Sequence, residues 1–301
     1  MSSPIRAKIE PITLLVAVGF LLAVNVNLAK AGTVAGASAL TLAFWLHFGA
    51  GLALLAAAWA TGERISVERP YLENYLASGI ASFAFPGVLG FVVAERVGPA
   101  YGSVIYAFSP LITYSLAVAV GLDRLALGRA VGLAIGLAGT GLVVASRFGL
   151  SAGSEGTWVL LALLVPASVA FGNVLRTKLW PPGAAGLALA PGSLITAGLL
   201  LAPFWLSQGA DEPLPSFSTP AGRIILAQMA VATVYYALFY RLQKVAGPVF
   251  LSQIGYVATG FGVAIAVRIF GDAVSLGMLA GIVLIVAGVL LVSRTTPRRS
   301  R

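Results

Sequence analysis

Long apolar runs separated by short charged segments constrain this chain more than any other feature. Ten such runs follow one another along the 301 residues. They lie at about 11–29, 40–60, 73–94, 99–121, 128–146, 157–175, 185–206, 223–240, 247–267 and 276–293. An α-helix needs about 20 predominantly apolar residues to cross the hydrocarbon core of a bilayer. The pattern therefore predicts an all-α integral membrane protein with ten transmembrane helices.

The composition excludes several other classes of protein. Hydrophobic residues make up 59% of the chain and charged residues only 10%, against roughly 25% charged in a soluble domain. The chain has no cysteine and one histidine, His47, so it offers no disulfide, no thiolate nucleophile and no two-histidine metal site. The net charge of +9 is not gathered into basic patches with aromatics, which argues against a nucleic-acid partner. We expect the lipid bilayer and a small-molecule substrate as partners, with no cofactor and no metal.

The basic residues divide unevenly between the two sides of the predicted bundle. Fourteen fall on the side of the N-terminus: Arg6, Lys8, Arg64, Arg69, Arg124, Arg129, Arg176, Lys178, Arg241, Lys244, Arg294, Arg298, Arg299 and Arg301. Five fall on the other side: Lys30, Arg96, Arg147, Arg223 and Arg268. Because cytoplasmic loops carry the excess of Lys and Arg, both termini are predicted to be cytoplasmic. The first run also resembles a secretory signal, but it is longer than a usual signal core.

The two halves of the chain resemble each other. A shift of 149 positions brings several residues into register: Gly98-Pro99 with Gly247-Pro248, Asp123 with Asp272, Gly132 with Gly281, and Ala138-Gly139 with Ala287-Gly288. A shift of 148 pairs Asn25 with Asn173. Five helices per repeat is an odd number, so the second copy must enter the membrane from the opposite side. We therefore expect repeats at 1–149 and 150–301, in the inverted arrangement of secondary transporters. A duplication that serves folding alone is the simpler alternative.

These residues also carry a resemblance to a known family. Asp-x-x-x-Leu-Gly-x-x-x-Gly in each half, Gly-Pro before the fourth and ninth runs, and Asn-x-x-x-x-Lys in the first and sixth resemble the drug/metabolite transporter superfamily. The closest branch is that of the ten-helix EamA-type exporters, and within it the YddG-type exporters of aromatic and other amino acids. The chain departs from the family in having Leu22-Ala23 where Trp-Gly is frequent. The resemblance implies export across a bacterial inner membrane, without enzymatic activity.

Polar and aromatic residues recur on single faces of several runs and predict the transport path. Such side chains are costly toward lipid, so these faces should turn inward. The candidate substrate-binding residues are Asn25, Phe83, Tyr106, Phe108, Phe171, Asn173, Tyr235, Tyr236, Gln253 and Tyr256. The resemblance implies pocket aromatics at Ile105–Phe108 in particular. A hydroxyl bonded to its own helix is the alternative for any single Ser or Thr of these faces.

Two features leave alternatives open. Gly128-x-x-x-Gly132-x-x-x-Gly136 and Gly277-x-x-x-Gly281 allow close helix packing, either within one chain or between two copies, so we expect a monomer or a loose homodimer. The prolines at 86, 110, 166 and 191 stand inside predicted spans as hinges or as plain kinks.

The chemistry of the path favours recognition without reaction. No acidic residue lies deep in any predicted span, so a proton relay would have only His47, for which a packed, hydrogen-bonded role is the simpler interpretation. Alternating-access export of amino acids is the main hypothesis. The alternatives are export or facilitated diffusion of another solute such as a drug or purine, a lipid-acting membrane enzyme, and a receptor or membrane subunit without transport.

Overall fold

The computed structural model describes residues 6–63, 65–89, 108–148, 161, 163–209, 211–270 and 275–295. Over these residues the chain is helical between its turns and contains no strand. The elements are α1 (Arg6–Val34), α2 (Ala39–Ala60), α3 (Arg69–Ser78), the π-helix η1 (Gly79–Ala84), α5 (Ser109–Ala119), α6 (Leu127–Phe148), α8 (Leu164–Lys178), α9 (Gly186–Leu206), α10 (Pro220–Ser252), α11 (Ile254–Phe270) and α12 (Leu276–Thr295). Residues 85–89 continue the chain from η1 as α-helix.

Five of the described helices are long and apolar enough to cross a membrane: Ile9–Val34, Ala39–Ala60, Gly186–Leu206, Pro220–Ser252 and Leu276–Arg294. Shorter apolar helices lie at Ser109–Ala119 and Leu127–Val143. The fold is thus that of a multi-pass helical membrane protein, as the apolar runs indicate. Parts of the third, fourth and sixth predicted runs, including Tyr106 in the fourth, lie outside the described residues.

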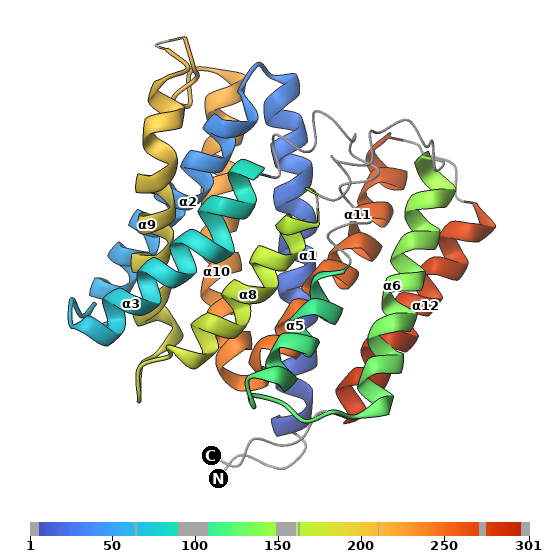
Figure 1. The fold of residues 1–301 in the computed structure, drawn as a ribbon. Coiled ribbons are helices and arrows are strands. Elements are labelled where there is room, and N and C mark those ends of the chain that lie inside the picture. Colours follow the sequence, from blue (N-terminus) through green and yellow to red (C-terminus); the bar gives the residue numbers. More distant parts are fainter. Residues whose placement is uncertain are drawn as a thin grey trace.

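The helices form a bundle with two tightly paired edges (Figure 1). Helices α2 and α9 pack together at one edge, and α6 and α12 pack together at the other. Between them, α1 packs against α10 and α11, while α5 and η1 pack against α8. The buried hydrophobic residues form one main cluster that draws on both halves of the chain. The central helices therefore surround the region in which a site has to be sought.

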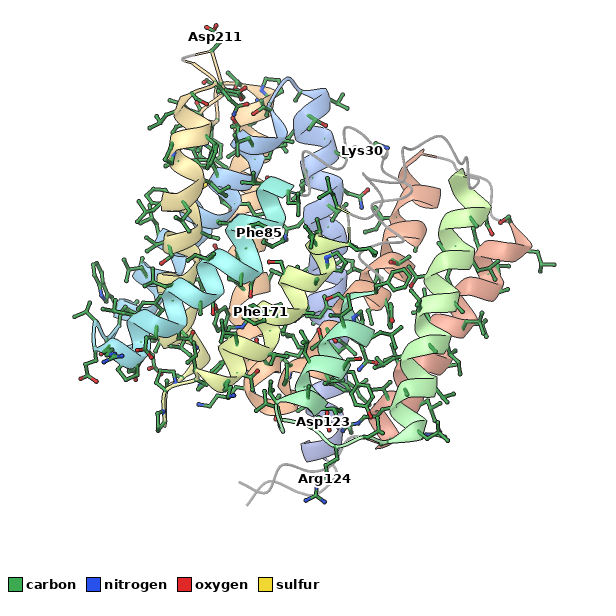
Figure 2. All side chains as sticks on the ribbon, in the orientation of Figure 1. Lys30, Phe85, Asp123, Arg124, Phe171 and Asp211 are labelled. Carbon is green, nitrogen blue, oxygen red and sulfur yellow. The ribbon has the colours of Figure 1, made fainter. Side chains whose placement is uncertain are left out.

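Charged residues lie at both ends of the bundle. Helix α1 begins and α12 ends at the same end, drawn at the bottom of Figure 1. Asp123 and Arg124 lie at that end, whereas Lys30 and Asp211 lie toward the opposite end (Figure 2). Arg124 and Lys30 thus lie at opposite ends of the bundle, in agreement with the two groups of basic residues predicted from the sequence.

Helix α10 extends beyond its expected end at residue 240. It continues to Ala246 and breaks only at Gly247, whose φ of 80° and ψ of 177° are outside the helical range. Glycine adopts such a positive φ without a steric penalty, and the following Pro248 has no N–H for the helix behind it. A second interruption at Gln253 separates α10 from α11. The expected connection between 240 and 247 is therefore wrong, and the break lies at the Gly-Pro pair itself.

Two of the four prolines expected inside spans lie at helix starts instead. Pro110 stands at the second position of α5, and Pro166 at the third position of α8. A proline in the first helical turn loses no intrahelical hydrogen bond, because its N–H would have no partner there. Pro110 and Pro166 therefore begin helices, while Pro191 does stand inside α9.

Glycines join α6 to α12 within the chain. A Cβ at Gly288 would lie 2.6 Å from the carbonyl oxygen of Gly132, and a Cβ at Gly139 would lie 2.7 Å from that of Gly281. Only residues without a side chain permit two helices to approach so closely. Of the two interpretations of the small-residue spacing, these contacts bear out packing within one chain.

Glu212, in the segment between α9 and α10, contacts the start of α2. Its carboxylate accepts hydrogen bonds from the Thr41 hydroxyl at 2.5 Å and from the Ser38 backbone N–H at 3.2 Å. A negative charge is favourable at a helix N-terminus, where backbone N–H groups lack partners. Replacing Glu212 by glutamine should therefore destabilise the protein by about 1 kcal/mol. The thermal midpoint of the purified variant in detergent measures this.

The neighbouring Asp211 provides a matched control. It is exposed, and no hydrogen bond or ion pair of its carboxylate is present in the described part of the chain. Asp211→Asn also removes one negative charge, yet its thermal midpoint should equal that of the unaltered protein. Equal midpoints for both variants would show that the contact of Glu212 with α2 contributes nothing.

Candidate functional site

A buried arginine lies at the centre of the most polar region of the core. Arg176 stands in the last turn of α8 and is fully buried. Its Nη1 donates to the Ser82 hydroxyl at 2.9 Å, its Nη2 to Asn173 Oδ1 at 2.7 Å, and its Nε to Gln243 Oε1. Every acceptor of these bonds is a neutral oxygen. They come from η1, α8 and α10, so the guanidinium joins three elements.

Aromatic rings enclose the guanidinium on its other sides. The Cζ atom of Arg176 lies 4.8 Å from the ring centre of Phe239, 5.2 Å from that of Tyr240 and 5.6 Å from that of Phe83. The negative faces of such rings attract a cation. Tyr235 and Tyr236 extend this group, with ring centres 4.7 Å apart. We call Ser82, Asn173, Arg176, Gln243 and the rings of Phe83, Tyr235, Tyr236, Phe239 and Tyr240 the arginine cluster.

Among the described residues, Arg176 has no carboxylate partner, whereas several other arginines do. Arg129, which is also buried, pairs with Asp123. Arg241 pairs with Glu10 at 2.7 Å, and Arg69 with Glu73 at 2.7 Å. No carboxylate of the described residues forms an ion pair with Arg176. A guanidinium stays charged even in a protein interior, so the cluster holds a net positive charge in a mainly apolar core.

The π-helix places Ser82 against Arg176. Pro86 cannot donate a hydrogen bond to the preceding turn, and the N–H of Phe85 reaches back five residues to the carbonyl of Ile80. The widened turn leaves the Ala81 carbonyl to accept from the Ser168 hydroxyl of α8 at 2.7 Å. Gly172 allows this approach, because a Cβ there would lie 2.2 Å from the Ser82 hydroxyl oxygen. Such single π turns within helices are frequent at functional sites.

Gln243 is held in place by a second set of bonds. Its side-chain amide donates to the backbone carbonyl of Asn173 at 2.8 Å and to the Thr177 hydroxyl at 2.7 Å. The last turn of α8 is held too, because Asn74 donates to the carbonyls of Arg176 and Leu179 at 3.1 Å each. These bonds orient the acceptors around the guanidinium before any ligand arrives.

His47 lies beside the cluster with both ring nitrogens engaged. Nδ1 lies 2.8 Å from the carbonyl oxygen of Ala43, which can only accept, so Nδ1 carries the hydrogen. Nε2 lies 3.1 Å from the hydroxyl of Tyr236. The ring centre of His47 lies 5.7 Å from that of Phe83. This geometry agrees with the interpretation of His47 as a packed, hydrogen-bonded residue.

Four of the ten candidate binding residues lie together in the cluster, namely Phe83, Asn173, Tyr235 and Tyr236. Tyr256 lies elsewhere: its hydroxyl donates to the Leu133 carbonyl of α6 at 3.0 Å, and its ring packs on Gly136. Phe171 is 52% exposed on α8 (Figure 2). Phe108 is partly buried just before α5, and Tyr106 lies outside the described residues.

Asn25 and Gln253 are buried with polar atoms left over. Gln253 is fully buried at the break between α10 and α11, and neither atom of its side-chain amide has a hydrogen-bond partner among the described residues. Asn25, in α1, donates to the Leu21 carbonyl at 3.2 Å, while its Oδ1 has no partner in the described part of the chain. Buried polar atoms without partners are rare in proteins, so both residues stay candidates for contact with a polar ligand.

The residue at the centre of the cluster is not among the candidates that the sequence predicts. By sequence, Arg176 is one of fourteen basic residues on the predicted cytoplasmic side, and Gln243 and Phe239 are not candidates either. The available signal was the spacing from Asn173, because residues three apart in a helix face the same way. Arg176 therefore shares a face with a residue that had been selected.

Comparison with known proteins finds a family match over the first half of the chain. Residues 10–145 match the EamA-like transporter family. The EamA-like domain indicates a small-molecule transporter of the drug/metabolite transporter superfamily, a group of transporters rather than enzymes. No curated protein matches the chain. A protein of known crystal structure, 18% identical, superposes with a TM-score of 0.76 over 98% of each chain, which shows a shared fold.

The family match supports the resemblance to the EamA-type branch, and the apolar helices agree with a multi-pass membrane protein. Neither comparison singles out the YddG-type subgroup or a substrate. The matched residues include most of α1 and all of α2, α3 and η1. Within them, α2 contributes His47 to the site region, and η1 contributes Ser82 and Phe83. The remaining residues of the arginine cluster come from beyond the EamA-like match.

Proposed function

We propose that this protein exports small metabolites, amino acids including aromatic ones above all, across a bacterial inner membrane by alternating access. One observation carries the proposal: the arginine cluster is buried and polar, and it draws on both halves of the chain. Ser82 and Phe83 belong to residues 1–149, whereas Asn173, Arg176 and Gln243 belong to residues 150–301. Secondary transporters bind their substrates at such a junction between repeats.

The two halves are proposed to be inverted five-helix repeats. Two contacts between α6 and α12 support this. Gly132 meets Gly288, and Gly281 meets Gly139. A shift of 149 positions converts Gly132 into Gly281 and Gly139 into Gly288, so each contact becomes the other when the halves are exchanged. A two-fold axis between two repeats generates this reciprocity.

The orientation and the assembly are proposed on charge and packing. The start of α1 and the end of α12 share one end of the bundle, where Arg124 also lies (Figure 2). That end is proposed to be cytoplasmic, because it carries the excess of basic residues. The glycines of α6 and α12 are used within one chain. A monomer or a loose homodimer fits this use.

Flux through proteoliposomes tests the function. We expect labelled amino acids, phenylalanine foremost, to exchange across the membrane of vesicles that contain the protein and not across that of empty vesicles. Tyr235→Leu should lower the flux about tenfold, because an aromatic contact of about 1.4 kcal/mol is lost. Initial rates at matched protein content measure this.

Phe204→Leu is the matched control, because Phe204 of α9 is 54% exposed and lies outside the arginine cluster. Its flux should equal that of the unaltered protein. Absence of flux for every amino acid in the panel would contradict the proposed substrate class. Flux of a drug or purine instead would select the alternative export function, and no flux of any solute would favour a membrane subunit without transport.

A further inference from the structure

Arg176 has no role yet in the proposed transport cycle beyond its place in the cluster. We propose that Arg176 binds the carboxylate of the transported substrate, and that the site takes small monocarboxylates with an apolar or aromatic body. The inference rests on the proposed function, and it names the chemical group that this site selects.

Arg176 has no counter-charge among the described residues. Removing a guanidinium from water is unfavourable unless a partner charge and hydrogen bonds replace the water. Arg129 has such a partner in Asp123, whereas Arg176 has only neutral oxygens and aromatic faces within the described residues. An anionic ligand would supply the charge that the described residues do not.

The guanidinium of Arg176 has more N–H groups than its three hydrogen bonds use. The three hydrogen bonds to Ser82, Asn173 and Gln243 use one N–H on each nitrogen of the guanidinium. A guanidinium has five N–H groups, so each terminal nitrogen carries a second one. Guanidinium groups in general pair two parallel N–H groups with the two oxygens of a carboxylate, and bidentate pairs of this kind are strong and specific. A lysine at this position would lack that fork.

Aromatic rings surround the guanidinium of Arg176. Phe83 and Phe239 lie next to it, and Tyr236 packs against both of them. These rings offer stacking partners for an aromatic substrate body adjoining its carboxylate. Arg176 is fully buried in this conformation. Its donors therefore become accessible only when the halves move, as alternating access requires.

The described residues of the cluster offer no partner charge for the amino group of the substrate. The described carboxylates that form ion pairs do so with other arginines, and Glu212 contacts the start of α2. Among the described residues, no carboxylate belongs to the cluster to pair with an ammonium group. A deaminated acid should therefore bind about as well as its amino acid, whereas an amide, which lacks the negative charge, should bind poorly.

Competition in proteoliposomes tests the preference. The labelled substrate is the amino acid with the largest flux. The unlabelled competitors are the amide and the deaminated acid of that amino acid. For phenylalanine these are phenylalaninamide and 3-phenylpropanoate. We expect the inhibition constant of 3-phenylpropanoate to be within about tenfold of that of phenylalanine. The amide should inhibit at least about tenfold more weakly than phenylalanine, because a site that binds a particular group rejects an analogue that lacks it.

Two variants and a control assign the preference to Arg176. Arg176→Lys should raise the KM for the acid by at least about tenfold, and Arg176→Gln should abolish the preference for acid over amide. Arg129→Lys alters the buried arginine that has a carboxylate partner, and it should keep the preference. Calorimetric titration of 3-phenylpropanoate into the purified protein gives a readout without transport, and the unaltered protein suffices for it even where a variant fails to fold.

The outcomes separate this inference from the proposed function. Equal competition by acid and amide in the unaltered protein, or flux of a solute without an anionic group, would overturn the carboxylate site and leave transport standing. Calorimetric binding of 3-phenylpropanoate that Arg176→Gln abolishes, without any flux, would support the site and contradict transport. A preference for the acid that persists in Arg176→Gln would overturn the assignment to Arg176.

Discussion

Gly288→Ala is expected to force α6 and α12 apart and to lower the stability of the folded protein by about 1–3 kcal/mol or more. The added Cβ would lie 2.6 Å from the Gly132 carbonyl oxygen and 2.7 Å from the Gly136 backbone nitrogen. Both are backbone atoms, so no side chain can rotate away and the helices themselves must move. Thermal unfolding of the purified protein in detergent, monitored by size-exclusion chromatography, measures the loss of stability.

Gly141→Ala is the matched control for this prediction. Gly141 also lies in α6, but nothing lies within 4 Å of a Cβ built there. The same substitution should be neutral, or stabilising by up to about 1 kcal/mol, because alanine is the better helix former. A Gly288→Ala protein as stable as Gly141→Ala would show that α6 and α12 do not depend on this close approach.

Gly172→Ala is expected to abolish most of the transport activity while leaving the protein able to insert in a membrane. Its Cβ would lie 2.2 Å from the Ser82 hydroxyl oxygen and 2.8 Å from the Ser82 backbone nitrogen. The π-helix η1 must then move away from α8, and Ser82 loses its bond with Arg176. A hydrogen bond to a charged group is worth about 1.5–3 kcal/mol, which corresponds to a decrease in flux of about ten- to a hundredfold.

Gly260→Ala controls for the effect of a helical glycine as such. Gly260 lies in α11, and nothing lies within 4 Å of a Cβ built there. The flux of the Gly260→Ala protein should therefore equal that of the unaltered protein. Initial rates at matched protein content in vesicles give both values. Normal flux in Gly172→Ala would mean that the contact of η1 with α8 does not position the site.

Several elements follow closely from the apolar pattern. The runs expected at 40–60, 185–206 and 276–293 correspond to α2, α9 and α12 within two residues at each end. Charged or turn-forming residues bound these helices on both sides, so the edge of the apolar run is also the edge of the helix. The run expected at 73–94 fits less well, since it contains α3 and η1 before residues 85–89. Hydropathy does not distinguish an α-turn from a π-turn.

The candidate site was predictable only in part. Phe83, Asn173, Tyr235 and Tyr236 share faces that avoid lipid, and periodicity alone selects such faces. Tyr256 satisfies the same rule, yet its hydroxyl bonds to the backbone of α6. Periodicity states that a residue points inward but not which neighbour it meets. Contacts between α8, α10 and η1 join positions as far apart as Ser82 and Arg176, and no local pattern encodes them.

The sequence by itself determined the membrane class, the approximate helices and the distribution of charge between two sides, because these depend on the transfer of whole segments from water to lipid. Only the tertiary structure decided what Arg176 does. By sequence it is a basic residue near a helix end, where such residues usually reach the membrane surface. Its neighbours in the fold enclose it instead. Burial without a carboxylate partner among the described residues makes Arg176 a candidate binding group.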